Sequence, residues 1–320
     1  MLLYVVWVIL VLSVFAAAVG SQALFALDLS ERRSGQLRAA YIARGALPYA
    51  AQALAGDETP TVDGLGEWWS NNAVRFQERP LGEGTFSLIG EESAGRATRY
   101  GLTDEERHLN LNTAPAAVLQ RLLVAQAAVR ASDAEAIAAS IEDWRDTDDK
   151  ERPLGAENAY YQTRHDPYAC KDGPFENIEE LLLVKGVTPT AYARVAPYLT
   201  VHGSGRLNLN TASPVALQAL GLSEAGVSGL VSFRGGGDNL ASSSDGQVLT
   251  SIAALESDLK GVLPVEDLAQ LKRLAAEDVL GVRSEAFRAV IQAQTARASE
   301  RMRVSCVIDR QGRVLSWSER

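Results

Sequence analysis

The feature that most constrains the fold is an uncharged apolar run at the N-terminus. Residues 1–27 contain no Asp, Glu, Lys or Arg, and the first charged side chain is Asp28. As a helix, this run would be about 40 Å long, more than the ~30 Å hydrocarbon core of a bilayer. It also lacks the polar face of a soluble helix before Ser21. Residues 1–27 are therefore predicted to form a transmembrane helix.

A cleaved signal peptide is the alternative interpretation of this run, because residues 16–20 include small side chains typical of a cleavage site. No basic residue precedes the run, however, and apolar side chains continue to Leu27. A retained helix is therefore favoured. Its orientation is open at this point, because four arginines that follow it would keep the body of the chain cytoplasmic by the positive-inside rule: Arg32, Arg33, Arg38 and Arg44.

Composition excludes several classes of function. With 320 residues, the chain has room for two domains, or for one domain with an insertion. A net charge of −9 argues against binding to nucleic acid, whose phosphates require basic patches. The two cysteines, Cys170 and Cys306, form either one disulfide or two unrelated thiols. The three histidines are far apart and no catalytic motif is present, so no enzyme activity is expected.

The order of the expected elements predicts an α+β fold with an inserted domain. After the transmembrane helix at 1–27, an amphipathic continuation is expected over 28–56. A first part of an antiparallel sheet follows over 57–111, with a helical piece around Trp68 and Trp69 and strands at 85–89, 98–102 and 108–112. A helical domain is predicted over 112–282, with a flexible loop at Gly235–Gly237, Asp238 and Ser242–Ser244. The C-terminal strands, over 283–320, include a hairpin turn at 309–312.

The helical domain contains an internal repeat. The sequence Leu-Asn-Leu-Asn-Thr-Ala occurs at 109–114 and again at 207–212, each time before an apolar helical pattern. Asn and Thr can cap the helix that follows, so each copy is predicted to begin a helix-hairpin-helix (SAM-like) module. Many such modules bind DNA, but here the surroundings are acidic. A structural or protein-binding role is therefore favoured over DNA binding.

An acidic loop between the two repeats is the only candidate metal site. Carboxylates that alternate along a loop suit Ca²⁺, which takes six to eight oxygen ligands. The spacing is not that of an EF-hand. The alternative is a solvated loop that Arg145, Lys150 and Arg152 partly neutralise. The candidate ligands are Asp146, Asp148 and Glu157, followed by Asp143 and Asp149.

Taken together, these features resemble the minor pseudopilins of type II secretion known as the general secretion pathway protein K (GspK) family. The resemblance rests on the apolar helix that runs into residues 39–46, both copies of the repeat, and the segments 143–148 and 155–161. It also rests on residues 177–181, Val184–Gly186 and the closing strands near Trp317. It covers nearly the whole chain.

The resemblance implies a pilin-like fold, in which the long N-terminal helix packs on the antiparallel sheet and the helical domain is inserted in that sheet. It implies a subunit at the tip of a periplasmic pseudopilus, in a hetero-oligomeric complex with other minor pseudopilins, that helps to initiate assembly and so supports protein export. Before assembly the helix would lie in the inner membrane, with the C-terminal domain in the periplasm. Calcium in the helical domain is also implied.

The family's pattern at the N-terminus leads to two further expectations. A basic leader is expected before the apolar run, and prepilin peptidase is a partner if that leader precedes Met1. No Glu lies near the fifth residue of the run, which suits a tip subunit with no neighbour above it. The alternatives are a membrane-anchored DNA-binding protein with helix-hairpin-helix units and a minor pilin of a type IV pilus.

Overall fold

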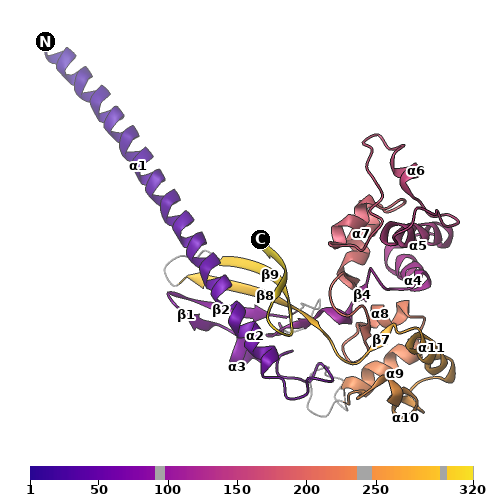
Figure 1. Cartoon of the computed structure of the whole chain (residues 1–320). Helices are drawn as coiled ribbons and strands as arrows, with labels where there is room; N and C mark the ends of the chain where they lie inside the picture. Colours follow the sequence, from indigo (N-terminus) through magenta and orange to yellow (C-terminus); the bar gives the residue numbers. More distant parts are fainter. Residues whose placement is uncertain (91–97, 236–246, 296–300, 320) are drawn as a thin grey trace.

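The N-terminal helix extends away from the rest of the molecule (Figure 1). The computed structural model describes residues 1–90, 98–235, 247–295 and 301–319. Helix α1 (Leu2–Gly45) and helix α2 (Leu47–Ala55) form a rod that is interrupted at Ala46, just before Pro48. No residue of α1 before Gly35 is buried, and the most apolar window of the rod has a mean hydropathy of 2.8. The helix is therefore long and apolar enough to span a membrane.

The sheet is antiparallel and is built from both ends of the chain. Its strands have the order β1-β2-β8-β9-β10, and β3 also pairs with β8. The central pair, β2 and β8, runs from Gly84 opposite Thr295 to Ile89 opposite Val290. The strands are β1 (Arg79–Leu81), β2 (Gly84–Ile89), β3 (Thr103–Asp104), β8 (Ala286–Thr295), β9 (Arg301–Asp309) and β10 (Val314–Glu319). The predicted insertion of a helical domain into one sheet is confirmed.

Small side chains let the rod approach the sheet closely. The rod contributes a row of fully or almost fully buried alanines: Ala39, Ala43, Ala46, Ala50 and Ala53. Strand β8 alternates between buried and half-buried side chains, with Phe287, Ala289, Ile291 and Ala293 buried beneath the rod. Gly84 marks the closest approach, because a Cβ there would lie 2.7 Å from Cδ1 of Ile42 and 2.2 Å from the carbonyl oxygen of Gln294. This packing is the core of the pilin-like part.

The helical domain consists of two modules, each closed by a short parallel ladder. In the first module, β4 (Leu109–Asn110) pairs with β5 (Leu199–Thr200), and in the second, β6 (Leu207–Asn208) pairs with β7 (Leu280–Gly281). The first module contains α4 (Ala116–Ala127), α5 (Ala131–Arg145), α6 (Asn158–Tyr161) and α7 (Pro189–Val195). The second contains α8 (Pro214–Ala219), α9 (Glu224–Gly235), α10 (Leu255–Leu259) and α11 (Val265–Ala276). The described residues also include short 3-10 helices at Glu105–Arg107, Ile178–Leu183, Ala196–Tyr198 and Ile252–Ala254.

The two modules share the same polar framework, which explains the repeated sequence. The Asn112 side chain accepts from the amide of Phe175 and donates to its carbonyl. In the second module, Asn210 makes the same pair of bonds with Leu249. The two modules also share a half-buried arginine: Arg145 donates to carbonyls of residues 111 and 114, and Arg234 to those of residues 209 and 212.

Several predictions about local structure were wrong. Trp68 and Trp69 lie in turns, and the first helical turn after them is α3 (Ala73–Phe76), because Asn72 caps it. The strand expected at 98–102 is displaced to β3, and only Tyr100 bridges to Ile89. Thr211 does not cap the second repeat helix; Ser213 does. Most of the loop expected from Gly235 lies outside the described residues.

A buried polar cluster joins the sheet to the second module. Arg310 contacts both oxygens of Asp63, and its Nη1 lies 3.0 Å from Asp57. The carboxylate of Asp104 accepts from Asn208, Thr211 and Ser284. We call this cluster the junction. It consists of Asp57, Asp63, Asp104, Asn208, Thr211 and Arg310, of which Asn208 and Thr211 belong to the second module. They fix the position of the helical domain on the sheet.

Candidate metal centre

The acidic loop follows α5 and lies over an aromatic cluster. The last turn of α5 places Trp144 inside the first module, where its ring centroid is 5.2 Å from that of Tyr161. Phe175 and Tyr168 pack on the same indole. Because Trp144 is fixed in the core, Asp143 and Asp146 on either side of it are held at the start of the loop.

The carboxylate of Asp143 holds the loop in place through hydrogen bonds to both of its oxygens. Its carboxylate, which is completely buried, accepts from the amide of Ala156 at 2.8 Å and from Nη1 of Arg152 at 2.8 Å. Arg152 also pairs with Oδ2 of Asp146. Gly155 is required here, because a Cβ would lie 1.9 Å from Oδ2 of Asp143. These contacts bring residue 157 back towards the end of α5.

Glu157 lies near two other carboxylates that each have a buried oxygen without a hydrogen bond. Its side chain is only 3 % exposed, and neither of its oxygens accepts a hydrogen bond from a described residue. Oδ1 of Asp172 and Oδ1 of Asp146 are likewise buried and unbonded. Ligand atoms of Glu157, Asp172 and Cys170 lie within 4.8 Å of one another. We call Asp146, Glu157, Cys170 and Asp172 the carboxylate cluster.

The electrostatics of the carboxylate cluster favour a cation. Burial, together with the negative charges of Asp143, Asp172 and Asp146, raises the pKa of Glu157 to about 7. Among the ion pairs of the described residues, none involves Glu157 or Asp172. Leaving a buried carboxylate unpaired is costly, so a positive ion at this position would be stabilising.

The donor set fits calcium better than a thiolate-binding metal. Burial raises the pKa of the Cys170 thiol to about 12, so its sulfur remains protonated and is a poor ligand. The remaining donors are carboxylate oxygens, which hard cations such as Ca²⁺ prefer. The residues of the carboxylate cluster therefore fit an oxygen-bound divalent cation.

Of the five predicted ligands, two lie in the carboxylate cluster and three do not. Glu157 and Asp146 belong to the carboxylate cluster, whereas Asp143 is engaged by Arg152 and backbone amides. Asp148 and Asp149 are exposed, and Asp148 accepts a hydrogen bond from the amide of Lys150. The sequence interpretation missed Asp172, which lies beyond α6 with a left-handed backbone (φ +50°). Its only local signal was the Asp-Gly-Pro run at 172–174, which predicts a turn.

Comparison with known proteins places these observations in a family. The family model described as type II secretion system (T2SS), protein K matches residues 100–204, which include the first module and the carboxylate cluster. Type II secretion system protein K of Aeromonas hydrophila is 29 % identical over 240 residues, which cover 69 % of this chain and 70 % of that protein. The protein of the same name from Pectobacterium carotovorum subsp. carotovorum is 30 % identical over 217 residues, covering 65 % and 64 %. The chain is therefore similar to type II secretion system protein K over about two thirds of its length.

A solved structure supports the fold. A chain in the crystal structure of the GspK-GspI-GspJ complex from the type 2 secretion system of enterotoxigenic Escherichia coli matches with a TM-score of 0.66. The match covers 92 % of this chain and 99 % of that chain at 21 % identity. The predicted pilin-like fold with a helical insertion is thus confirmed. The chain is a minor pseudopilin of type II secretion, and these relatives do not support the DNA-binding or type IV pilus alternatives.

Proposed function

We propose that this minor pseudopilin is a tip subunit of the type II secretion pseudopilus and helps to initiate its assembly. In this role it binds two other minor pseudopilins, the counterparts of GspI and GspJ, and supports export of folded proteins across the outer membrane. The observation that carries the proposal is the rod of α1 and α2, whose N-terminal part is apolar and unburied before Gly35. Such a helix requires either lipid or other apolar helices around it.

The same observation leads to a proposal about location. Before assembly, α1 spans the inner membrane and the sheet and helical domain lie in the periplasm. On assembly, the helix leaves the lipid and packs with the corresponding helices of its partners. Residues 1–27, which would exchange lipid for protein contacts, carry no charged side chain.

Complex formation by the full-length chain tests this function. We expect the chain, purified in detergent, to form a stoichiometric ternary complex with the cognate counterparts of GspI and GspJ, measured by light scattering after size-exclusion chromatography. A detergent-solubilised single-helix protein of unrelated fold serves as the control and is expected to remain apart. If all three proteins migrate separately at about 10 µM, which is well above the Kd of a stable complex, the proposal is wrong.

We also propose that the carboxylate cluster binds Ca²⁺. The proposal is supported by the three carboxylates with buried, unbonded oxygens, which belong to Asp146, Glu157 and Asp172. Bound calcium would neutralise these groups and tie the loop after α5 to the segment after α6. The ion would therefore stabilise the first module without taking part in any reaction.

A pair of variants separates calcium binding from a solvated acidic loop. In wild type, calcium at about 100 times its Kd is expected to add about 2.7 kcal/mol to the free energy of unfolding. Glu157→Gln is expected to lose this gain, yet to be at least as stable as wild type in chelator, because it removes an unpaired buried charge. Asp149→Asn, on the exposed part of the loop, should retain the gain. Equal calcium responses of the two variants in thermal unfolding and calorimetry would exclude the site.

A further inference from the structure

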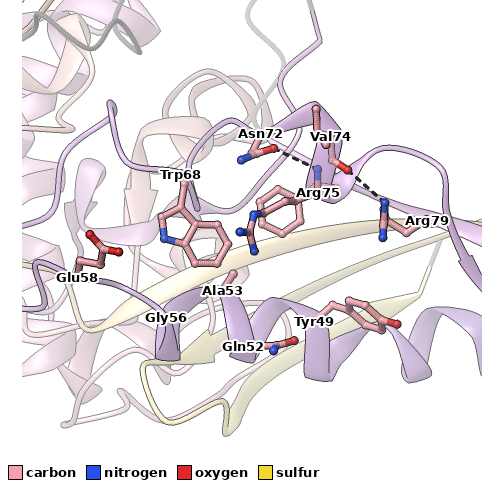
Figure 2. A pocket seen from close by; sticks show the side chains of 11 residues that line it. Tyr49, Gln52, Ala53, Gly56, Glu58, Trp68, Asn72, Val74, Arg75 and Arg79 are labelled. Carbon is pink, nitrogen blue, oxygen red and sulfur yellow. Dashed lines mark hydrogen bonds between the residues drawn. The ribbon is translucent and has the colours of Figure 1, made fainter.

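A groove beside α2 is not used by the fold or by the carboxylate cluster. It has a volume of about 730 Å³ and lies between α2 and the segment that leads through α3 to β1. Figure 2 shows Tyr49 and Gln52 of α2 on one side of the groove and Trp68, Arg75 and Arg79 on the other. Since β1 is the last strand on this side of the sheet, the groove lies at a sheet edge.

The walls of the groove present aromatic faces and two arginines. The Trp68 and Phe76 rings are stacked, with centroids 6.1 Å apart, and the Arg75 guanidinium lies 4.8 Å from the Trp68 ring. Arg79 donates to the carbonyl of Val74 at 3.2 Å. Within the described part of the chain, neither arginine pairs with a carboxylate. The cations are therefore available to an external group.

The remaining polar groups make the groove rich in hydrogen-bond donors. The side-chain amide of Gln52 and the indole N–H of Trp68 make no hydrogen bond to any described residue. Glu58 is the only carboxylate among the residues that line the groove in the described structure. An occupant should therefore carry carboxylates and apolar surface together.

An exposed apolar strip connects the groove to the membrane helix. Leu37 and Tyr41 of α1 are 62 % and 68 % exposed, and Tyr49 of α2, which lines the groove, is 38 % exposed. The groove lies about 30 Å along the rod from residue 27, so lipid headgroups around the apolar run do not reach it. A helix that packs along α1 would follow the strip and arrive at the groove.

We infer that the groove receives a carboxylate-bearing segment of the N-terminal helix of a neighbouring pseudopilin, which pairs with Arg75 and Arg79 and packs on Trp68 and Tyr49. This inference rests on the proposed function, since it assigns a contact surface to that assembly. Charge complementarity then fixes how far the neighbouring helix is shifted along the rod. Apolar contacts alone, as in the lipid-spanning part, would fix that position only weakly.

Charge reversal tests the inference. Affinity of the full-length chain in detergent for the cognate counterparts of GspI and GspJ is measured at low and high salt. Arg75→Glu and Arg79→Glu are each expected to raise Kd at least about tenfold and to reduce the salt dependence, because each turns an attraction into a repulsion. Arg194→Glu on α7 is the matched control, since Arg194 is exposed and unpaired among the described residues. Thermal unfolding checks that all variants remain folded.

The outcomes distinguish this inference from the function on which it rests. Rescue of Arg75→Glu by an acidic-to-Arg change in the partner's helix would support the inference. A wild-type complex that neither groove variant weakens would overturn it and leave the proposed function intact. If the groove variants lose self-association and still bind the partners, the groove receives a second copy of this chain and the inference is overturned. Failure of wild type to bind either partner would overturn both proposals.

Discussion

At the residue scale, Arg310 shows how a single side chain can hold two parts of the chain together. Its side chain is only 8 % exposed and contacts Asp57 and Asp63, while its Nε donates to the carbonyl of Ser284. Burial raises the pKa of Asp63 to about 6 even though Arg310 acts in the opposite direction. The guanidinium therefore compensates a carboxylate that would otherwise be very unfavourable in the junction.

Loss of this guanidinium should destabilise the protein strongly. Arg310→Met keeps the length and apolar packing of the side chain but leaves Asp57 and Asp63 without their cation, so we expect a loss of about 3–5 kcal/mol in the free energy of unfolding near pH 8. The loss should be smaller near pH 5, where Asp63 becomes protonated. Arg313→Met is the control, because the Arg313 side chain is exposed and its pair with Asp309 contributes about 1 kcal/mol. Urea unfolding measures both, and similar losses would contradict this role.

At the scale of elements, each copy of the repeated sequence supplies an asparagine that holds a distant loop through hydrogen bonds. Asn112 and Asn210 each bind both backbone groups of a residue far along the chain, Phe175 and Leu249. The repeat itself was visible in the sequence, because identical residues at identical spacing are a local property. Its partners were not, because the intervening loops differ in length and composition. The expected cap by Thr211 was wrong because that hydroxyl bonds Asp104 in the junction instead.

For the acidic loop, too, the sequence revealed the residues present but not which of them meet in the folded protein. Its carboxylates were evident from composition, and Glu157 was among the expected ligands. The distinction between buried and exposed members depends on how Asp143 and Gly155 fold the loop back. Asp172 joins them because the chain after α6 returns to the side of Glu157.

At the scale of the whole molecule, the junction and the neighbouring Glu106, which interacts with Asp104, should make the stability depend on pH. Burial raises the pKa of Glu106 to about 7, with the charge of Asp104 acting in the same direction, and it raises that of Asp63 to about 6. Raised pKa values mean that the folded state holds these protons more tightly than the unfolded state. The contribution to stability is therefore complete below about pH 4 and is lost as pH rises through 6 to 7.

We expect the free energy of unfolding, measured in chelator, to decrease by on the order of a few kcal/mol between pH 5 and pH 8. Glu106→Gln should flatten the part of this curve near pH 7, because the amide oxygen can still accept from the amides of Ser204 and Glu285 but no longer titrates. Glu285→Gln, at a half-buried carboxylate that pairs with Arg283 near the surface, is the control. A stability that increases with pH over this range in wild type would refute the assignment.

The sequence alone determined the properties that depend on neighbouring residues. The uncharged run at 1–27, the alternation of β8, the hairpin turn before Gly312 and the repeats are local patterns of hydrophobicity and chain stiffness. They were sufficient for the fold class and for the resemblance to the family. Tertiary structure alone decided which polar groups meet. Arg310 contacts Asp63 across 247 residues, and the groove joins α2 to Arg75 and Arg79, because packing of the rod on the sheet brings distant segments together.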